Sequence, residues 1–164
     1  MSLKINIEQA SYSDTGAISE IVKLANIPVA KQFALTRDNA PSHPSLCTPD
    51  WIRAGMDRGE RYFIGERIGL KVGCVAYESP EPGLAYLNRL AVLPDYQNLG
   101  VGQALVHHIL TLAKEDQKNN VSIGIIKAHT ILRDWYAGLG FIPSGTKTFD
   151  HLPFDVQFMT CDLR

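Results

Sequence analysis

Residues 84–102 read LAYLNRLAVLPDYQNLGVG, and the rest of the fold can be built around them. The first part, residues 84–93, is apolar on both faces, which predicts a central strand covered on both sides. A periodic apolar stripe predicts a helix over residues 101–117 directly after it. Between the two, Gly100 and Gly102 permit a sharp turn and let a ligand approach the main chain without a Cβ in the way. The first N–H groups of a helix lack internal partners and lie at the positive end of its dipole, so this turn suits phosphate oxygens.

Further strands and helices are predicted on either side of this turn. The strands share short apolar runs or apolar alternation, and we expect them at residues 3–7, 61–66, 70–78, 84–93, 121–127, 141–147 and 156–163. The helices share apolar residues at helical spacing, and we expect them at residues 15–24, 49–58, 101–117 and 130–139. Short joints favour antiparallel hairpins before the turn, whereas the strand after the helix returns in parallel through a right-handed crossover. The fold class is therefore α/β in the wide sense (α+β), with a mixed sheet.

The segment from residue 26 to residue 49 has a different character from its surroundings. It contains Pro28, Pro41, Pro44 and Pro49 among several Ser, Thr and Asn residues. Such a composition predicts a long irregular segment with at most short helical turns. Long ordered loops often carry function, so this segment is a candidate for contacting a substrate.

Length, composition and charge restrict the class of protein. The chain has 164 residues, which predicts one domain over residues 1–164, and 45% of them are hydrophobic, as in an ordinary globular protein. Lys and Arg total 16 against 17 Asp and Glu, so no basic field favours nucleic acid or an anionic membrane as a partner. No apolar run is long enough to span a membrane, and the polar N-terminus does not resemble a signal peptide. We expect a cytoplasmic location.

The cysteines and the adjacent histidines do not indicate a metal site. Cys47, Cys74 and Cys161 are far apart and odd in number, which argues against a disulfide framework and against structural zinc. Cys74 and Cys161 stand in apolar strand-like runs and are expected to fill the core. His107 and His108 lie on a predicted helix with no third ligand at a suitable spacing, so no metal is expected.

Two motifs in their observed order resemble the acetyl-coenzyme A motifs of the GNAT N-acetyltransferase superfamily. The first is Leu90-Ala91-Val92-x-Pro94-x-Tyr96-Gln97-x-x-Gly100-x-Gly102, and the second is Trp135-Tyr136-Ala137-Gly138-Leu139-Gly140-Phe141. The resemblance spans nearly the whole chain. It implies a mostly antiparallel central sheet with helices on both faces, in which the parallel crossover pair splays apart to form a cofactor slot. It also implies an N-acetyltransferase with acetyl-CoA as its co-substrate.

The resemblance assigns roles to particular positions. Backbone N–H groups from Gln97 to Gly102 would hold the coenzyme A pyrophosphate, and the strand beside them would pair with the pantetheine arm. His129 stands where many relatives have an asparagine that contacts the coenzyme. The implied cofactor-binding residues are therefore Leu90, Ala91, Val92, Gln97, Asn98, Leu99, Gly100, Val101, Gly102 and His129.

Tyr136 is the candidate catalytic residue. It matches the tyrosine that in GNAT enzymes lies near the thioester sulfur, and its phenol is suited to protonating the departing thiolate. Packing beside Trp135 in a helix is the structural alternative, and one side chain can do both. A main-chain N–H near Leu90 is the natural donor to the oxyanion.

The general base and the acceptor site are less well defined by the sequence. Many relatives place a glutamate where this chain has Asn88, which is not a useful proton acceptor. Glu78, His129 and His151 are the alternative bases, each of them acting through water. The acceptor is expected to lie against the proline-rich segment and residues 148–153, where aromatic and acidic residues gather: Phe33, His43, Phe149, Asp150 and His151. The substrate-binding candidates are Phe33, Glu78, Asn88 and His151.

Other interpretations remain open at this point. Asn88 favours an acyl-CoA-binding sensor or scaffold that is weakly active or inactive. The glycine turn alone is also compatible with a mononucleotide site, although no base-recognition or magnesium motif accompanies it. The acceptor is either a small-molecule amine or a peptide amine, and exposed edge strands in such a sheet allow a homodimer.

Overall fold

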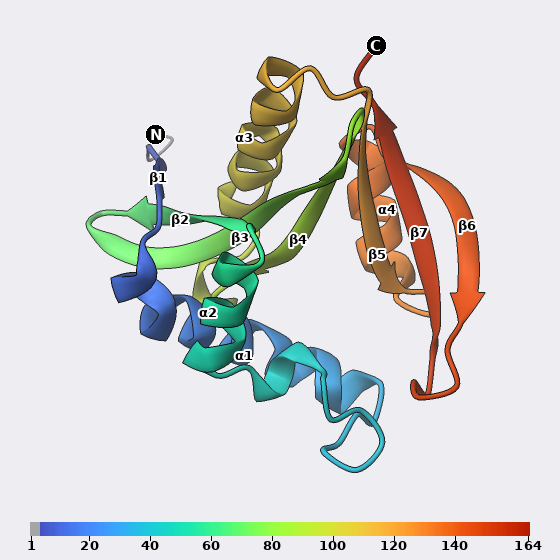
Figure 1. Ribbon diagram of the computed structural model, residues 1–164. Coiled ribbons are helices and arrows are strands. Elements are labelled where there is room, and N and C mark those ends of the chain that lie inside the picture. Colours follow the sequence, from blue (N-terminus) through green and yellow to red (C-terminus); the bar gives the residue numbers. More distant parts are fainter. Residues whose placement is uncertain (1–3) are drawn as a thin grey trace.

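The computed structural model describes residues 4–164, which form a seven-stranded sheet in the order β1-β2-β3-β4-β5-β7-β6 (Figure 1). The strands are β1 (Asn6–Gln9), β2 (Arg61–Arg67), β3 (Leu70–Glu81), β4 (Leu84–Val92), β5 (Asn120–Ile126), β6 (Ile142–Thr148) and β7 (Asp155–Asp162). Neighbouring strands are antiparallel except for β4 and β5, which are parallel. The predicted mixed, mostly antiparallel sheet with a parallel crossover pair is thus confirmed.

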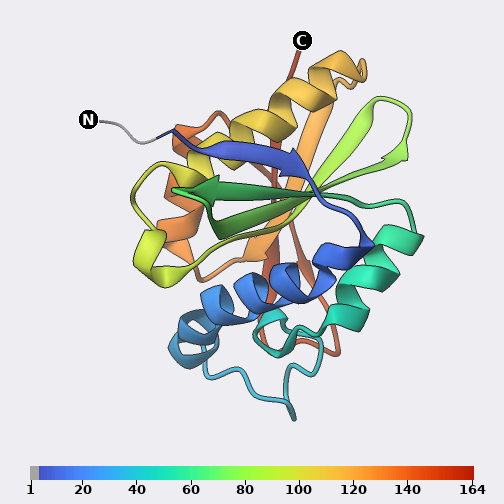
Figure 2. The same cartoon turned by 90° about the vertical axis from the view of Figure 1, so that its left-hand side faces the viewer.

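Helices cover both faces of this sheet (Figure 2). They are α1 (Thr15–Gln32), α2 (Pro49–Asp57), α3 (Val101–Glu115) and α4 (Thr130–Gly138), with the one-turn helices η1 (Tyr12–Asp14), η2 (Pro44–Leu46) and η3 (Pro94–Tyr96). Side chains of α1 and α2 pack in one core, and those of α3 and α4 pack in a second core on the opposite face.

Successive side chains of β3 point alternately into the two cores. Val75 and Tyr77 belong to the core on the α3 face, whereas Cys74 and Ala76 belong to the core on the α1 face. Cys74 is fully buried and Cys161 nearly so, as expected for cysteines that fill the core. β4 is the central strand of the order, which explains why its sequence is apolar on both faces.

The largest error of the sequence analysis lies in α1. This helix continues to Gln32 with Pro28 inside it, so the prediction of irregular structure from residue 26 is wrong as far as residue 32. Proline removes one helical hydrogen bond, but tertiary packing of the helix can outweigh that local cost. Asn26, one turn after Val22, donates from Nδ2 to the Val22 carbonyl oxygen at 2.8 Å. The irregular segment with its one-turn helix η2 begins only after Gln32.

Strand boundaries differ from the predictions where pairing sets them. β1 runs from Asn6 to Gln9 rather than over residues 3–7, because its partners in β2 extend from Glu66 to Phe63. Leu3, the predicted first residue of that strand, lies outside the described residues. β3 extends three residues further than predicted, to Glu81, because it remains paired with β4 up to Leu84.

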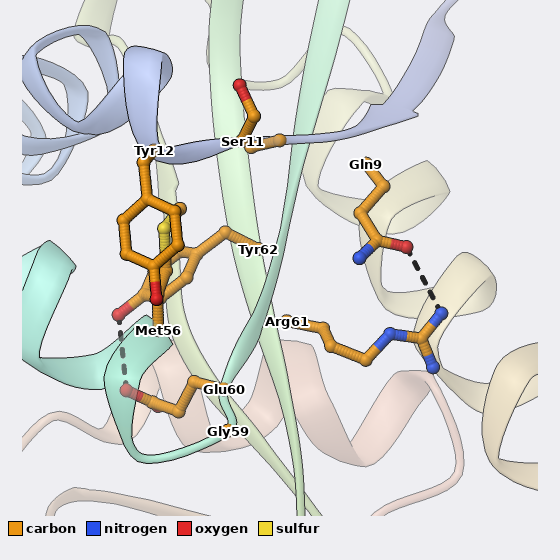
Figure 3. A pocket seen from close by; sticks show the side chains of 9 residues that line it. Gln9, Ser11, Tyr12, Met56, Gly59, Glu60, Arg61 and Tyr62 are labelled. Carbon is orange, nitrogen blue, oxygen red and sulfur yellow. Dashed lines mark hydrogen bonds between the residues drawn. The ribbon is translucent and has the colours of Figure 1, made fainter.

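Polar contacts hold the segment between β1 and α1. A hollow of about 250 Å³ lies between this segment and the start of β2, where the Tyr62 hydroxyl donates to the Glu60 carboxylate at 3.3 Å (Figure 3).

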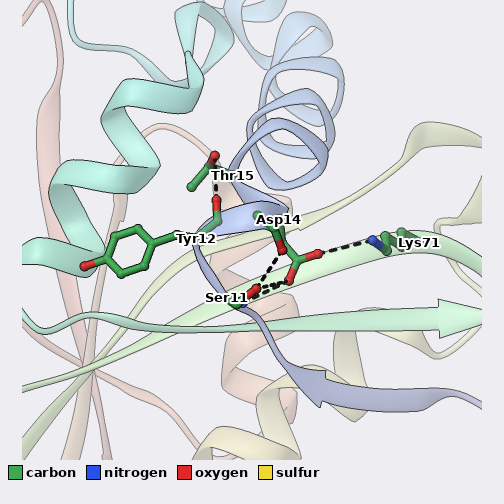
Figure 4. A network of polar contacts seen from close by, with 6 residues as sticks. Ser11, Tyr12, Asp14, Thr15 and Lys71 are labelled. Atoms are coloured by element: carbon green, nitrogen blue, oxygen red, sulfur yellow. Dashed lines mark hydrogen bonds and ion pairs between the residues drawn. The ribbon is translucent and has the colours of Figure 1, made fainter.

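The Asp14 carboxylate accepts from the Ser11 N–H at 2.9 Å and from Lys71 Nζ at 3.3 Å (Figure 4). The hydrogen bond from the Ser11 backbone is the main cause that lowers the pKa of Asp14. Asp14, which directly precedes α1, therefore also links the start of this helix to β3 through Lys71.

Gly73 on β3 permits the close approach of α3. A Cβ at this position would lie 2.9 Å from Leu105 Cδ1 and 2.9 Å from Val101 Cγ1. We expect Gly73→Ala to lower the free energy of unfolding by about 1–3 kcal/mol, because these side chains must move. Gly16→Ala is the matched control, since a Cβ there meets no atom within 4 Å, and we expect it to raise stability by up to about 1 kcal/mol. Urea unfolding measures both, and equal effects would contradict this account of Gly73.

Candidate active site

The parallel strands β4 and β5 separate after a short paired stretch. Only Leu84, Ala85 and Tyr86 of β4 pair with β5. Beyond Tyr86 the two strands diverge (Figure 1), and a cavity of about 330 Å³ lies between them. The splayed pair expected from the resemblance is therefore present.

Both faces of the sheet contribute to the lining of this cavity. Residues 87–90 of β4 and 123–126 of β5 form its sides. Asn26 and Val29 of α1 lie on one face, and Tyr136 of α4 lies on the other. A molecule in the cavity would thus have access to groups on both sides of the sheet, which is the geometry needed when two substrates must meet.

A β-bulge lies in the β4 wall of the cavity. Cys74 of β3 pairs with Ala91, but Ala76 pairs with Asn88, so Arg89 and Leu90 together face a single residue of β3. Arg89 has a positive φ of 53°, an uncommon conformation outside glycine. Bulges re-aim the main chain and often occur next to active sites. The irregular main chain lies at the position where a donor to the oxyanion was expected, near Leu90.

The turn between β4 and α3 presents free N–H groups. Asn98 and Gly100 have positive φ values of 62° and 89°. The N–H groups of residues 98–103 have no hydrogen-bond acceptor among residues 4–164. Gln97 braces the turn by donating from Nε2 to the Val92 carbonyl oxygen at 3.0 Å. Successive outward N–H groups at a helix N-terminus form a concavity suited to an anion.

Gly102 allows α3 and α4 to approach each other. A Cβ on Gly102 would lie 3.3 Å from two atoms of the Trp135 ring. The Trp135 ring in turn contacts Tyr136 edge-on, with ring centroids 5.0 Å apart. The second glycine of the motif therefore places the Trp135-Tyr136 pair close to the start of α3.

Tyr136 is packed on its ring and free at its hydroxyl. Its ring also contacts Phe141, with centroids 5.4 Å apart, and only 5% of the residue is exposed. The hydroxyl has no hydrogen-bond partner among residues 4–164, although the side chain lines the cavity. Burial raises the pKa of Tyr136 above its ordinary value of 10.0. The raised pKa keeps the phenol protonated, so its hydroxyl can donate a hydrogen bond to a group in the cavity.

His129 contributes an unpartnered, buried nitrogen beside the cavity. Its side chain lines the cavity, and its Nδ1 is the one buried side-chain nitrogen or oxygen without a partner within residues 4–164. Burial lowers the pKa of this histidine, which favours the neutral ring. Phe33, at the end of α1, stacks against it with ring centroids 5.4 Å apart. Buried polar atoms are normally satisfied, so a ligand in the cavity can supply the missing partner of this nitrogen.

Asn88 joins two carboxylates on the α1 face of the sheet. Its Nδ2 donates to Glu60 Oε2 at 2.9 Å and to Glu78 Oε2 at 2.9 Å, and its own side chain lines the cavity. The Glu60 side chain is only 5% exposed and also accepts from the Tyr62 hydroxyl (Figure 3). Glu78 is thus brought beside a cavity residue. Glu60 was missed by the sequence analysis, because nothing between Gly59 and Arg61 indicates a buried carboxylate.

His151 lies in the loop between β6 and β7 and is not part of the cavity lining. Its ring contacts Phe149 edge-on, with ring centroids 5.6 Å apart, whereas Phe154 of the same loop lines the cavity. His43 lines the cavity and is 92% buried, since only 8% of it is exposed. His43 was predicted only as one of the loop residues near the acceptor, because burial of a loop histidine leaves no signal in the sequence.

The described residues contain neither a metal-ligand cluster nor a membrane-spanning helix. Within residues 4–164, no three His, Cys, Asp or Glu side chains are grouped so as to hold a metal ion. None of the helices described has the length and apolar character needed to cross a membrane.

Comparison with known proteins gives a family match. The model of the acetyltransferase (GNAT) family matches residues 30–141. An amino-acid acetyltransferase of Vibrio atlanticus (strain LGP32) is 26% identical over 153 residues, which cover 92% of this chain. The chain spans only 29% of the length of that curated relative.

Solved structures share the fold at low sequence identity. The ribosomal-protein-S18-alanine N-acetyltransferase from Escherichia coli has a TM-score of 0.77 at 16% identity, covering 98% of this chain and 94% of that one. A GNAT family acetyltransferase from Elizabethkingia anophelis with acetyl-CoA bound has a TM-score of 0.71 at 16% identity, covering 97% and 98% of the two chains.

Proposed function

The chain belongs to the GNAT acetyltransferase family, and on that premise we propose that it transfers the acetyl group of acetyl-CoA to a primary amine by direct attack on the thioester. The observation that carries the proposal is the cavity between β4 and β5 beside a turn of free N–H groups. Acetyl-CoA supplies an activated acyl group with a good leaving group. The protein then has to bind the two substrates, orient them and transfer protons to and from them.

Binding is assigned mainly to the main chain. The N–H groups of residues 98–102 hold the pyrophosphate, and the main chain of Leu90, Ala91 and Val92 pairs with the pantetheine arm along the β4 edge that β5 leaves free. The Gln97 N–H, which the resemblance also assigned to the pyrophosphate, is left out because it donates to the Pro94 carbonyl oxygen at 3.4 Å. His129 Nδ1 accepts from the arm. These assignments are supported by the unpaired N–H groups of the turn, the short β4–β5 pairing and the unpartnered His129 nitrogen.

The chemistry needs one donor for the oxyanion and one for the thiolate. Main chain at the bulge near Leu90 donates to the carbonyl oxygen as negative charge develops there. Tyr136 gives its hydroxyl proton to the sulfur as the carbon–sulfur bond breaks and the carbon–nitrogen bond forms. The free hydroxyl and its place in the cavity lining support this role.

Glu78 is assigned as the general base, acting through water on the incoming amine. Neither Glu78 nor His151 lines the cavity, but Glu78 accepts a hydrogen bond from Asn88, which does, and this contact supports the choice of Glu78. We expect Glu78→Gln to lower kcat/KM by about 10²- to 10⁴-fold, because a carboxylate that accepts a proton is lost. The dissociation constant for acetyl-CoA should be unchanged in calorimetry. His151→Gln is the control and should retain activity, and the reverse pattern would exclude Glu78.

The test of the function is thiol release from acetyl-CoA with a panel of amines. We expect release to depend on an amine and to be matched by an acetylated product in mass spectrometry. Binding of acetyl-CoA without amine-dependent release would favour the alternative, an acyl-CoA-binding sensor or scaffold. Asn88 in place of a glutamate is the observation behind that alternative.

Three further expectations accompany this proposal. We infer one acetyltransferase domain over residues 1–164, because a single sheet contains strands from Asn6 to Asp162. A cytoplasmic location stays a prediction. A homodimer also stays a prediction, for which β6 offers an exposed edge strand.

A further inference from the structure

His43 has a defined tautomer, fixed by the turn that follows it. The Ser45 N–H donates to His43 Nδ1 at 3.2 Å, and Ser45 Oγ lies 2.8 Å from the same nitrogen. Because a backbone N–H only donates, Nδ1 must carry the lone pair, and the proton of the neutral ring is then on Nε2. Burial lowers the pKa of His43, which favours this neutral form.

Asn88 presents a free hydrogen-bond acceptor, whereas His43 presents a free donor. Both hydrogens of its Nδ2 are directed to carboxylates, one to Glu60 and one to Glu78. An inverted amide would place its oxygen against two carboxylates, so the orientation of the side chain is fixed. Its Oδ1 has no partner among the described residues and remains an acceptor.

The two residues that carry these free atoms line the same cavity. His43 and Asn88 both line it, and neither His43 Nε2 nor Asn88 Oδ1 is hydrogen-bonded to residues 4–164. Neither is sealed from solvent, since only His129 Nδ1 is both buried and unpartnered within the described chain. His43 directly precedes η2, which packs against α1, and Asn88 contacts Glu60 and Glu78 on the same face of the sheet. Tyr136 and the start of α3 belong to the opposite face.

We propose that this donor–acceptor pair selects an acceptor whose amine stands next to a carbonyl or carboxylate oxygen, as in an amino acid or a peptide N-terminus. This inference rests on the proposed acetyltransferase function. Asn88 Oδ1 accepts a hydrogen from the amine nitrogen, and His43 Nε2–H donates to the neighbouring oxygen. A polyamine has no oxygen to pair with His43, and by displacing solvent from the cavity it would leave that donor unsatisfied.

The two hydrogen-bonding roles of His43 can be separated by substitution. In His43→Asn, the short side chain can still accept from the Ser45 N–H but places no group at the Nε2 position. In His43→Gln, the longer amide can place an N–H near that position. The substrates are L-alaninamide and propan-2-amine, which share a branched primary amine and differ in the carbonyl group.

The expected result is a change in the preference between the two amines rather than a general loss of activity. We expect His43→Asn to lower kcat/KM for L-alaninamide about 5- to 100-fold, mainly through KM, and to leave propan-2-amine within about twofold. His43→Gln should restore a large part of the preference. Because each variant is compared between two amines, the intrinsic difference in their basicity cancels. Binding of acetyl-CoA in calorimetry checks that each variant is folded.

Failure of the inference and failure of the proposed function have different outcomes. If both amines are acetylated but His43→Asn affects them equally, the role of His43 is overturned and the acetyltransferase function stands. If acetyl-CoA binds and neither amine nor any other in the panel releases thiol, the acetyltransferase function is overturned, and the inference with it.

Discussion

Replacing Tyr136 by phenylalanine is expected to lower kcat by about 10²- to 10⁴-fold while leaving the dissociation constant for acetyl-CoA unchanged. The ring of Tyr136 is held by Trp135 and Phe141, so phenylalanine should keep the same packing. Only the hydroxyl is lost, and it has no partner among residues 4–164 whose hydrogen bond would be broken. Loss of activity would therefore report on proton donation to the thiolate.

The measurement is steady-state thiol release at saturating acetyl-CoA, with calorimetry for the donor. Tyr86→Phe is the matched control, since Tyr86 lies on β4 but does not belong to the cavity lining. It should turn over at the rate of the unmodified protein. Full turnover by Tyr136→Phe, with normal acetyl-CoA binding, would exclude Tyr136 as the general acid.

Replacing Gly100 by glutamate is expected to weaken acetyl-CoA binding by about 100-fold or more. Gly100 has a φ of 89°, so any side chain there strains the turn, and a carboxylate would repel the pyrophosphate. A Cβ at Gly100 meets no atom within 4 Å, so the substitution creates no clash in the core. The loss should therefore be in binding rather than in folding.

Gly69→Glu is the matched control for this change. Gly69 also has a positive φ, of 74°, and open space around its Cβ position, but it lies in the turn between β2 and β3. Both variants carry the same new charge and a similar backbone strain. Similar acetyl-CoA affinities of the two variants in calorimetry would contradict the assignment of the pyrophosphate to residues 98–102.

Local sequence patterns predicted those strands, turns and helices whose formation depends on residues close together in the chain. The apolar run of β4, the glycines at 100 and 102 and the stripe of α3 follow directly from periodicity and turn chemistry. The boundaries of β6 and β7 were predicted to within one residue. The resemblance then supplied Tyr136 and His129, and the structure places both along the same cavity.

Features that depend on distant contacts could not be predicted in this way. The continuation of α1 through Pro28 goes against a local preference. The bulge at Arg89 depends on register with β3 and has no glycine to mark it. The burial of Glu60 and His43 depends on partners brought together by the fold, Tyr62 and Asn88 for the carboxylate and Ser45 for the imidazole.

The central claim is that main-chain groups at the start of α3 bind the pyrophosphate of acetyl-CoA while the cavity between β4 and β5 receives its acylated arm. Isothermal titration calorimetry with acetyl-CoA and with acetyl-pantetheine, which lacks the pyrophosphate together with the 3′-phosphoadenosine, tests it most directly. We predict saturable binding of acetyl-CoA and binding of acetyl-pantetheine that is weaker by about 100-fold or more, because charge-assisted hydrogen bonds are lost. Absence of acetyl-CoA binding, or equal affinities for the two compounds, would contradict the claim.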